Sequence, residues 1–214
     1  MTASSKSAAE SKEEYALRTL RRLSACAVIL SGLVFGAVAQ SQDLGEEWTA
    51  LSAADAEIIF RDPSLGDKVE RHLRTTDDGY RYTFEIALWT GTLSRIPAAQ
   101  VHYHKLLPGY FFRGMPDPKE ITGAFTFFQD GDVEFAGLRN TASRLGQFKS
   151  RRFHFAGVEC VSFVLQFGVS SSDRGSGETR RIYGFYCADP GVPLSDTRVD
   201  LVLGNIAIRS EGAP

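Results

Sequence analysis

Residues 160–187, CVSFVLQFGVSSSDRGSGETRRIYGFYC, decide the fold, because they contain two strand-like segments separated by a polar loop that contains glycine. In the first segment, apolar side chains alternate at Val161, Phe163, Leu165 and Phe167, so they share one inward face of a strand. The second segment, RRIYGFYC, is rich in aromatic residues. We expect two neighbouring antiparallel strands.

Cys160 and Cys187 bracket this stretch, and the third cysteine, Cys26, lies in an apolar N-terminal segment. The spacing is not that of a redox CxxC motif, and the flanks offer no further cysteine or histidine for a zinc site. A pair of reduced core thiols is the simplest alternative. In an oxidising compartment the two cysteines predict one structural disulfide between strand ends, which stabilises the fold by about 3 kcal/mol.

The N-terminal segment has the layout of a signal peptide. A basic pair, Arg21 and Arg22, precedes an uncharged apolar run from Leu23 to Ala39 that ends in a small-x-small triplet. This predicts a signal peptide over residues 1–39, cleavage between Ala39 and Gln40, and a periplasmic or secreted protein. The alternative is an uncleaved anchor, which would hold the chain at the inner membrane, facing the periplasm.

The remainder predicts a short linker, 40–47, and a single domain, 48–210, with no membrane-spanning segment after cleavage. The formal net charge of the 214-residue chain is −2, and no Lys/Arg block exceeds two residues. A nucleic-acid-binding surface needs a concentration of positive charge. The composition therefore argues against nucleic acid as a partner.

Three hairpins are expected. The clearest strand is Tyr80–Thr90, where period two places Tyr82, Phe84, Ile86 and Leu88 on one buried face. The other expected strands and turns are 68–74 joined to this strand at Asp78-Gly79, AFTFF joined to VEFAG at Asp130-Gly131, and RRFHF joined to VECVSFVLQF at Ala156-Gly157.

Helices are expected near both ends of the domain. Ser52 is placed to cap the segment AADAEIIF, and Ser195 to cap a helix. In that second helix Val199, Val202, Leu203 and Ile206 form an apolar stripe facing the sheet. The predicted fold class is α+β: a single domain with a curved, mainly antiparallel sheet of about six to eight strands and flanking N- and C-terminal helices.

His102 and His104 are the strongest candidates for a metal site, because i and i+2 side chains share one face of a strand. The segment resembles the first half of a cupin metal motif, but the carboxylate that this motif requires is missing. A third ligand would have to come from elsewhere, and His72 and His154 are the other histidines. The alternative is an ordinary polar strand face.

Two arginine pairs, Arg151-Arg152 and Arg180-Arg181, lie in segments expected to be strands. One arginine from each pair could share a face and form a small anion-binding patch. The alternative is solubilisation, or pairing with nearby acids. The chain has no G-x-S-x-G or phosphate-loop motif, so no catalytic residue or cofactor is predicted.

The segment from Tyr183 to Gly191, YGFYCADPG, followed by the helix after Ser195, resembles the C-terminal part of small exported proteins of uncharacterised function from Gram-negative bacteria. The resemblance covers roughly the last quarter of the chain, from Cys160. It implies an exported location and a structural role for Cys187, and it supplies no catalytic residues.

These observations favour a non-enzymatic binding or accessory protein of the periplasm or envelope, whose partner is a protein or small ligand. One alternative is a metal-dependent envelope enzyme that uses His102 and His104. Another is a membrane-tethered accessory subunit, which requires that the leader stay attached.

Overall fold

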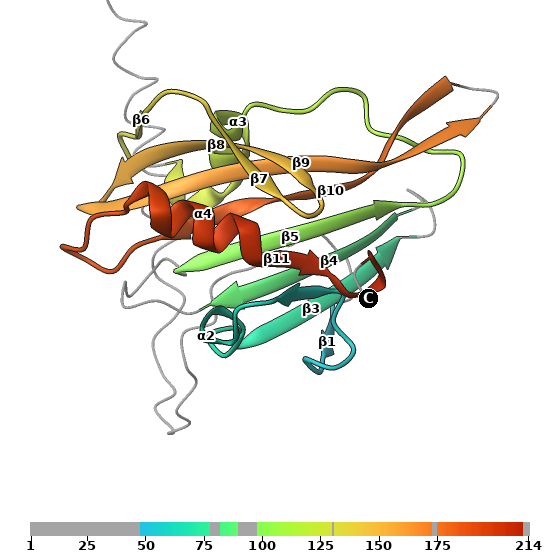
Figure 1. The fold of residues 1–214 in the computed structure, drawn as a ribbon, viewed down its shortest axis with the longest axis horizontal. Coiled ribbons are helices and arrows are strands. Elements are labelled where there is room, and N and C mark those ends of the chain that lie inside the picture. The colour runs from blue at the N-terminus through green and yellow to red at the C-terminus, as the bar shows by residue number, and fades with distance from the viewer. Residues whose placement is uncertain (1–47, 78–81, 90–97, 130, 173–174, 212–214) are drawn as a thin grey trace, which may run out of the picture. The chain divides into compact units, whose positions relative to one another are not determined.

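In the computed structural model, the two strands predicted within residues 160–187 are β9 (Val158–Ser172) and β10 (Gly175–Cys187). They pair antiparallel and form a long hairpin (Figure 1). The structure describes residues 48–77, 82–89, 98–129, 131–172 and 175–211, and all of them belong to one compact unit.

The hairpin lies inside a sheet of nine antiparallel strands, which is open rather than closed into a barrel. The order is β1-β3-β4-β5-β10-β9-β8-β6, and β7 also pairs with β8. The remaining strands are β1 (Thr49–Leu51), β3 (Arg71–Asp77), β4 (Tyr82–Trp89), β5 (Ala99–Leu106), β6 (Glu134–Phe135), β7 (Arg139–Ser143) and β8 (Gly146–Phe155). A second, two-stranded sheet joins β2 (Ile58–Phe60) to β11 (Ile206–Ile208).

Both faces of the sheet are covered (Figure 1). The first face packs against α4 (Asp196–Asn205) and the β2–β11 pair, and its core includes Val161, Phe163 and Leu165 of β9. The second face packs against α3 (Pro118–Ala124) and the 3-10 turn η1 (Thr126–Phe128). Short elements complete the chain: α2 (Pro63–Gly66) and η2 (Arg209–Glu211).

Cys160 and Cys187 form a disulfide, as predicted. The two residues are directly opposite in the β9–β10 register, and both are buried in the core of the second face. The hairpin between β8 and β9 is also confirmed, since Phe155 pairs with Val158. Its turn residues, Ala156 and Gly157, both have positive φ, as a tight two-residue hairpin turn requires.

The C-terminal helix is confirmed: the Ser195 side chain accepts a hydrogen bond from the Arg198 backbone N–H. All four side chains of its predicted stripe pack into the first core, although Ile206 already belongs to β11 and not to the helix. The strands around Asp78-Gly79 pair as expected, with Asp77 opposite Tyr82, although that turn lies outside the described residues.

Two local predictions are wrong. Ser52 caps no helix, because its hydroxyl bonds to Asp55 in a turn and the chain then enters β2, where Ile58 pairs with Ile208. The AFTFF segment is not a strand but the end of α3 and η1. Asp117 caps α3 and Pro118 begins it, which favours a helix. Within the described residues the main sheet has nine strands, whereas about six to eight were expected.

The buried face predicted for β4 also needs correction. Of the four side chains expected there, Ile86 is buried and the other three are half-buried. The more deeply buried face carries Glu85, Ala87 and Trp89. Glu85 is 1% exposed and accepts hydrogen bonds from the backbone N–H groups of Glu57 and Ile58, at 3.0 and 2.8 Å. Its carboxylate therefore connects β2 to the sheet.

Reducing the disulfide is expected to lower the free energy of unfolding by about 3 kcal/mol. The intact bond closes a chain loop and so restricts the unfolded state, and reduction removes this restriction. The measurement is the urea midpoint with and without a reductant. The C160A/C187A double variant is the control, and its midpoint should not respond to the reductant. An unchanged wild-type midpoint would contradict the prediction.

Gly184→Ala is expected to destabilise the protein by roughly 1–3 kcal/mol, because a Cβ there would collide with the backbone of β5 at Gln100 and Val101. Gly123→Ala, on α3, is the matched control, since a Cβ there meets nothing within 4 Å. Thermal unfolding of both variants measures the difference. Equal melting temperatures of the two variants would contradict the prediction, because β5 and β10 would then move apart to admit the Cβ without a loss of stability.

Candidate functional site

A cluster of aromatic, histidine and arginine side chains lies on the second face of the sheet, and we call it the aromatic–histidine cluster. Its members are Tyr82, Phe84, His102, His104, Phe112, Arg181 and Tyr183. Strands β4, β5 and β10 supply six of them, because the register places these side chains on one face. The seventh, Phe112, is held by its backbone N–H, which donates to the Glu178 carbonyl at 2.8 Å.

Both histidines of this cluster pack against rings. The ring centroid of His102 lies 4.8 Å from that of Tyr183, 5.0 Å from Phe84 and 5.3 Å from Phe125. The ring of His104 lies 4.6 Å from Tyr82. The prediction that the two histidines share one face is therefore confirmed, but their immediate neighbours are largely apolar.

This packing keeps the imidazoles neutral at neutral pH. Burial, and secondarily the neighbouring His104, lowers the pKa of His102 to about 3. Burial, and secondarily Arg181, lowers the pKa of His104 to about 4. Burial also raises the pKa of Tyr183 to about 12, so its phenol stays protonated.

Several polar atoms of the cluster are buried and have no hydrogen-bond partner among the described residues. The Gln100 side-chain amide lies 2.5 Å from Nε2 of His102, and the atoms in question are Nδ1 of that ring, Nε2 of His104 and Nε of Arg181. Nδ1 of His72, Nε of Arg74 and Nε1 of Trp89 are in the same condition outside the cluster, so these buried atoms do not by themselves mark a binding site.

The structure does not bring a third metal ligand to the histidine pair within its described part. His72 lies on the other face of the sheet, with Nδ1 4.0 Å from a Glu85 carboxylate oxygen, and His154 is exposed on β8. Among the described residues, no group of three metal-binding side chains is assembled. The pair supplies two imidazoles, which falls short of the three protein ligands of a catalytic zinc site.

The two arginine pairs do not combine into one patch. Arg151 makes a bidentate ion pair with Asp117, in which Nε and Nη2 lie 2.7 and 2.9 Å from the two carboxylate oxygens. These hydrogen bonds are the main reason why the pKa of Asp117 is lowered to about 2. Arg152 pairs with Asp196 at the start of α4. Both arginines therefore hold helices against the sheet, as expected for pairing with nearby acids.

Arg181 differs from these two arginines. Its guanidinium carbon lies 4.0 Å from the centre of the Phe112 ring, and Nη2 donates to the Gly114 carbonyl at 3.2 Å. No carboxylate of the described residues forms an ion pair with it. Burial lowers the pKa of Arg181 from its ordinary value, against a smaller opposing effect of Tyr183. The side chain is a half-buried cation on an aromatic surface.

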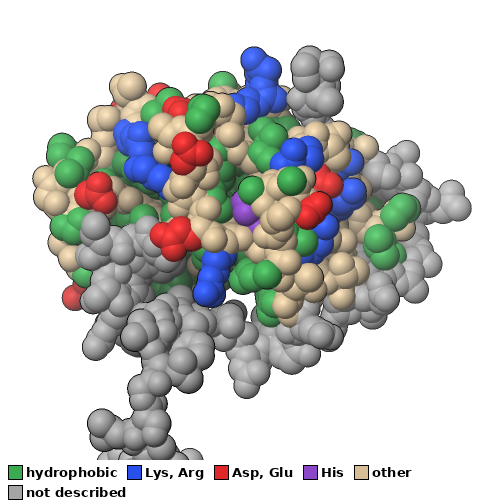
Figure 2. Space-filling model, turned by 90° about the horizontal axis from the view of Figure 1, so that it is seen from below, with side chains coloured by type: hydrophobic (Ala, Val, Ile, Leu, Met, Phe, Trp, Pro, Cys, Tyr) green, Lys and Arg blue, Asp and Glu red, His purple; other side chains and the backbone are tan. Residues whose placement is uncertain are grey.

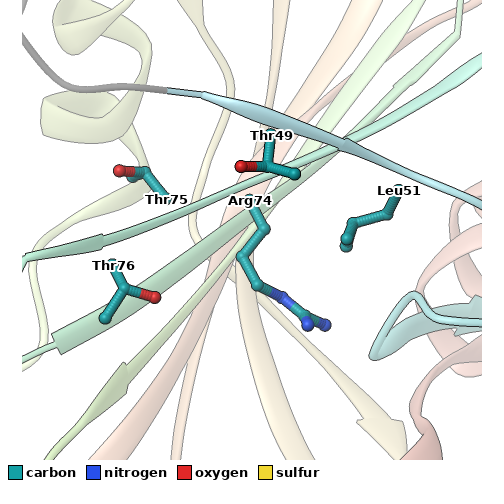
Figure 3. Close-up of a pocket in the computed structure, with 5 residues that line it drawn as sticks. All are labelled: Thr49, Leu51, Arg74, Thr75 and Thr76. Atoms are coloured by element: carbon teal, nitrogen blue, oxygen red, sulfur yellow. The ribbon is translucent and has the colours of Figure 1, made fainter.

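A hollow of about 410 Å³ lies at the β1–β3 edge, and Figure 3 shows its lining residues, Thr49, Leu51, Arg74, Thr75 and Thr76. Arg74 is already engaged, since its Nη2 donates to Glu85 at 2.8 Å and to the Asp55 carbonyl at 3.0 Å. We therefore assign Arg74 a structural role. Figure 2 views the molecule from below relative to Figure 1, and on the face that it shows basic and acidic side chains are interspersed.

A second hollow, of about 190 Å³, lies between α4 and the β6–β8 edge. Its two arginines are each paired with a carboxylate: Arg139 lies 2.6 Å from Asp200, and Arg152 pairs with Asp196. The aromatic–histidine cluster is therefore the stronger candidate site.

The sequence indicated three members of the cluster, His102, His104 and Arg181, but as separate features. Phe112 was missed, because the segment GYFFRGMP matches neither a strand nor a helix pattern. The available signal was a run of three aromatic residues, Tyr110 to Phe112, between two glycines. Gly177 shows why this segment fits, since a Cβ there would overlap the ring of Phe111.

No helix among the described residues is both long and apolar enough to cross a membrane. No protein-family model matches the chain, and comparisons with curated proteins and with solved structures found no significant match.

Lowering the pH is expected to reduce the free energy of unfolding between about pH 6.5 and pH 4. A histidine whose pKa is lowered by folding binds its proton more readily in the unfolded chain, so acid favours unfolding in that window. The loss levels off below the folded pKa values of about 3 and 4. Each histidine contributes a slope of ~1.4 kcal/mol per pH unit.

His102→Leu should make this pH dependence less steep, and His154→Leu, at an exposed position on β8, should leave it unchanged. Urea unfolding at a series of pH values measures both slopes. If the two variants behave alike, the buried ring does not cause the acid sensitivity.

Proposed function

We propose that this chain is an exported protein of the bacterial envelope, in which a disulfide-bonded sheet binds a partner or small ligand without catalysing a reaction. The observation that carries the proposal is the Cys160–Cys187 bond between paired strands. Disulfides persist in oxidising compartments such as the periplasm. The signal-peptide pattern over residues 1–39 and the resemblance to small exported proteins support the same location.

The aromatic–histidine cluster supports the binding role. Its rings at Tyr82, Phe84 and Phe112 are half-buried, so part of each is open to a ligand. Binding sites combine apolar walls with a few polar groups that orient the ligand. The half-buried Arg181 supplies such a polar group.

The metal-dependent enzyme stays a weaker proposal, because it needs a ligand beyond His102 and His104. The membrane-tethered subunit differs only in retaining its leader. One experiment separates the three.

The experiment is the intact mass of the protein recovered from the envelope fraction of an expressing Gram-negative cell, measured natively and after reduction. We expect a chain beginning at Gln40 and a gain of about 2 Da on reduction, as two thiols form. The C160S/C187S variant, which should gain nothing, is the control. A cytoplasmic chain with free thiols would overturn the proposal.

A full-length chain in the inner membrane would favour the tethered subunit. A stoichiometric metal that is lost in the H102A/H104A variant would favour the metal-dependent enzyme.

A further inference from the structure

Arg181 is a cation without a counter-charge among the described residues. Arg74, Arg139, Arg151 and Arg152 each lie within ion-pair distance of a carboxylate. Within the described part of the chain, Arg181 has no such carboxylate, and its guanidinium donates one hydrogen bond, to the Gly114 carbonyl. Taking a charge out of water is costly unless an opposite charge or several hydrogen bonds compensate it, so this half-buried guanidinium is suited to an added anion.

The surroundings of Arg181 restrict what that anion can be. The guanidinium packs on the Phe112 ring, and His104 stands directly opposite Arg181 in the β5–β10 register. The His104 ring lies 5.3 Å from Phe112 and 4.6 Å from Tyr82. Apart from the Gly114 carbonyl and the Gln166 amide that donates to it, the groups around the positive charge are therefore flat rings and a neutral imidazole.

This arrangement offers one positive charge and several aromatic surfaces. A phosphate dianion is usually bound by more than one cation or by a set of backbone N–H groups, and the cluster supplies neither. A carboxylate matches the planar guanidinium fork, and an aromatic body matches the surrounding rings.

We propose that Arg181 and the adjacent rings of Phe112, Tyr82 and Phe84 bind a small aromatic monocarboxylate. The carboxylate accepts hydrogen bonds from the guanidinium, and the ligand ring packs against the half-exposed aromatic side chains. This ligand class rests on the proposed binding function, because it names what the same face of the sheet would bind.

The test uses the chain as it is recovered from the expressing cell, with whatever N-terminus it carries. Benzoate is titrated at neutral pH and low salt, and the dissociation constant is measured by calorimetry alongside the shift in melting temperature. Benzamide, which has the same shape without the charge, and inorganic phosphate are the comparison ligands. We expect benzoate to bind at least ~10-fold more tightly than either. Benzamide cannot form the charged hydrogen-bonded pair with the guanidinium, and phosphate has no ring to pack against the aromatic side chains.

Arg181→Gln should weaken benzoate binding by ~10-fold or more, because the charge is removed. Arg180→Gln is the matched control: it removes the same charge one residue earlier, on the opposite face of β10, where Arg180 lies over the Phe167 ring. If Arg181→Gln fails to fold, Arg181→Lys keeps the charge but removes the planar fork, and it should also weaken binding. Phe112→Leu should weaken binding without changing the preference for benzoate over benzamide.

Equal affinity for benzoate and benzamide would overturn the proposal, and so would equal losses in the Arg181 and Arg180 variants. Binding of phosphate or of an acidic peptide in place of benzoate would also overturn it. None of these results depends on where the chain is located or on its disulfide. A failed titration therefore rejects the ligand class, whereas the mass measurement alone decides the export proposal.

Discussion

The structure depends on covering both faces of the β9–β10 hairpin with apolar side chains. Successive residues of β9 point to opposite faces, and from Cys160 to Gln166 both sets are buried, so neither face of this part of the hairpin can be left in water. α4 with the β2–β11 pair covers one face, and α3 with η1 covers the other. The disulfide joins the strand ends where the second of these cores is built, so the covalent bond and the apolar packing support the same pairing.

Charged side chains within this framework divide into two kinds. Glu85 and Arg151 are fully engaged: the first holds β2 against the sheet, and the second holds the Asp117 cap of α3. Arg181 packs on a ring and has no carboxylate partner within the described residues. This difference separates charges that maintain the fold from the one that we propose binds a ligand.

Local patterns predicted elements where sequence and packing agree. Alternation along β9, the Ala156-Gly157 turn and the Ser195 cap each correspond to a local conformational preference, and the structure confirms them. The Ser52 prediction failed because a nonlocal contact outweighed local preference, since Ile58 pairs with Ile208. The AFTFF prediction failed because the Asp117 cap and Pro118 begin a helix just before it, and Phe125 and Phe128 then pack against the second face. On β4 the alternating pattern was correct, but a buried glutamate made the deeper face look polar.

The sequence by itself determined the cysteine pair, the long hairpin, the C-terminal helix and the shared face of His102 and His104, because each depends on spacing along one or two neighbouring segments. Only the tertiary structure decided which arginines are neutralised and what surrounds the histidines. Arg151 meets Asp117 and Arg181 meets Phe112 because segments far apart in the chain fold over the same sheet face. Such contacts depend on strand order and on the path of the connecting loops, which side-chain periodicity does not encode.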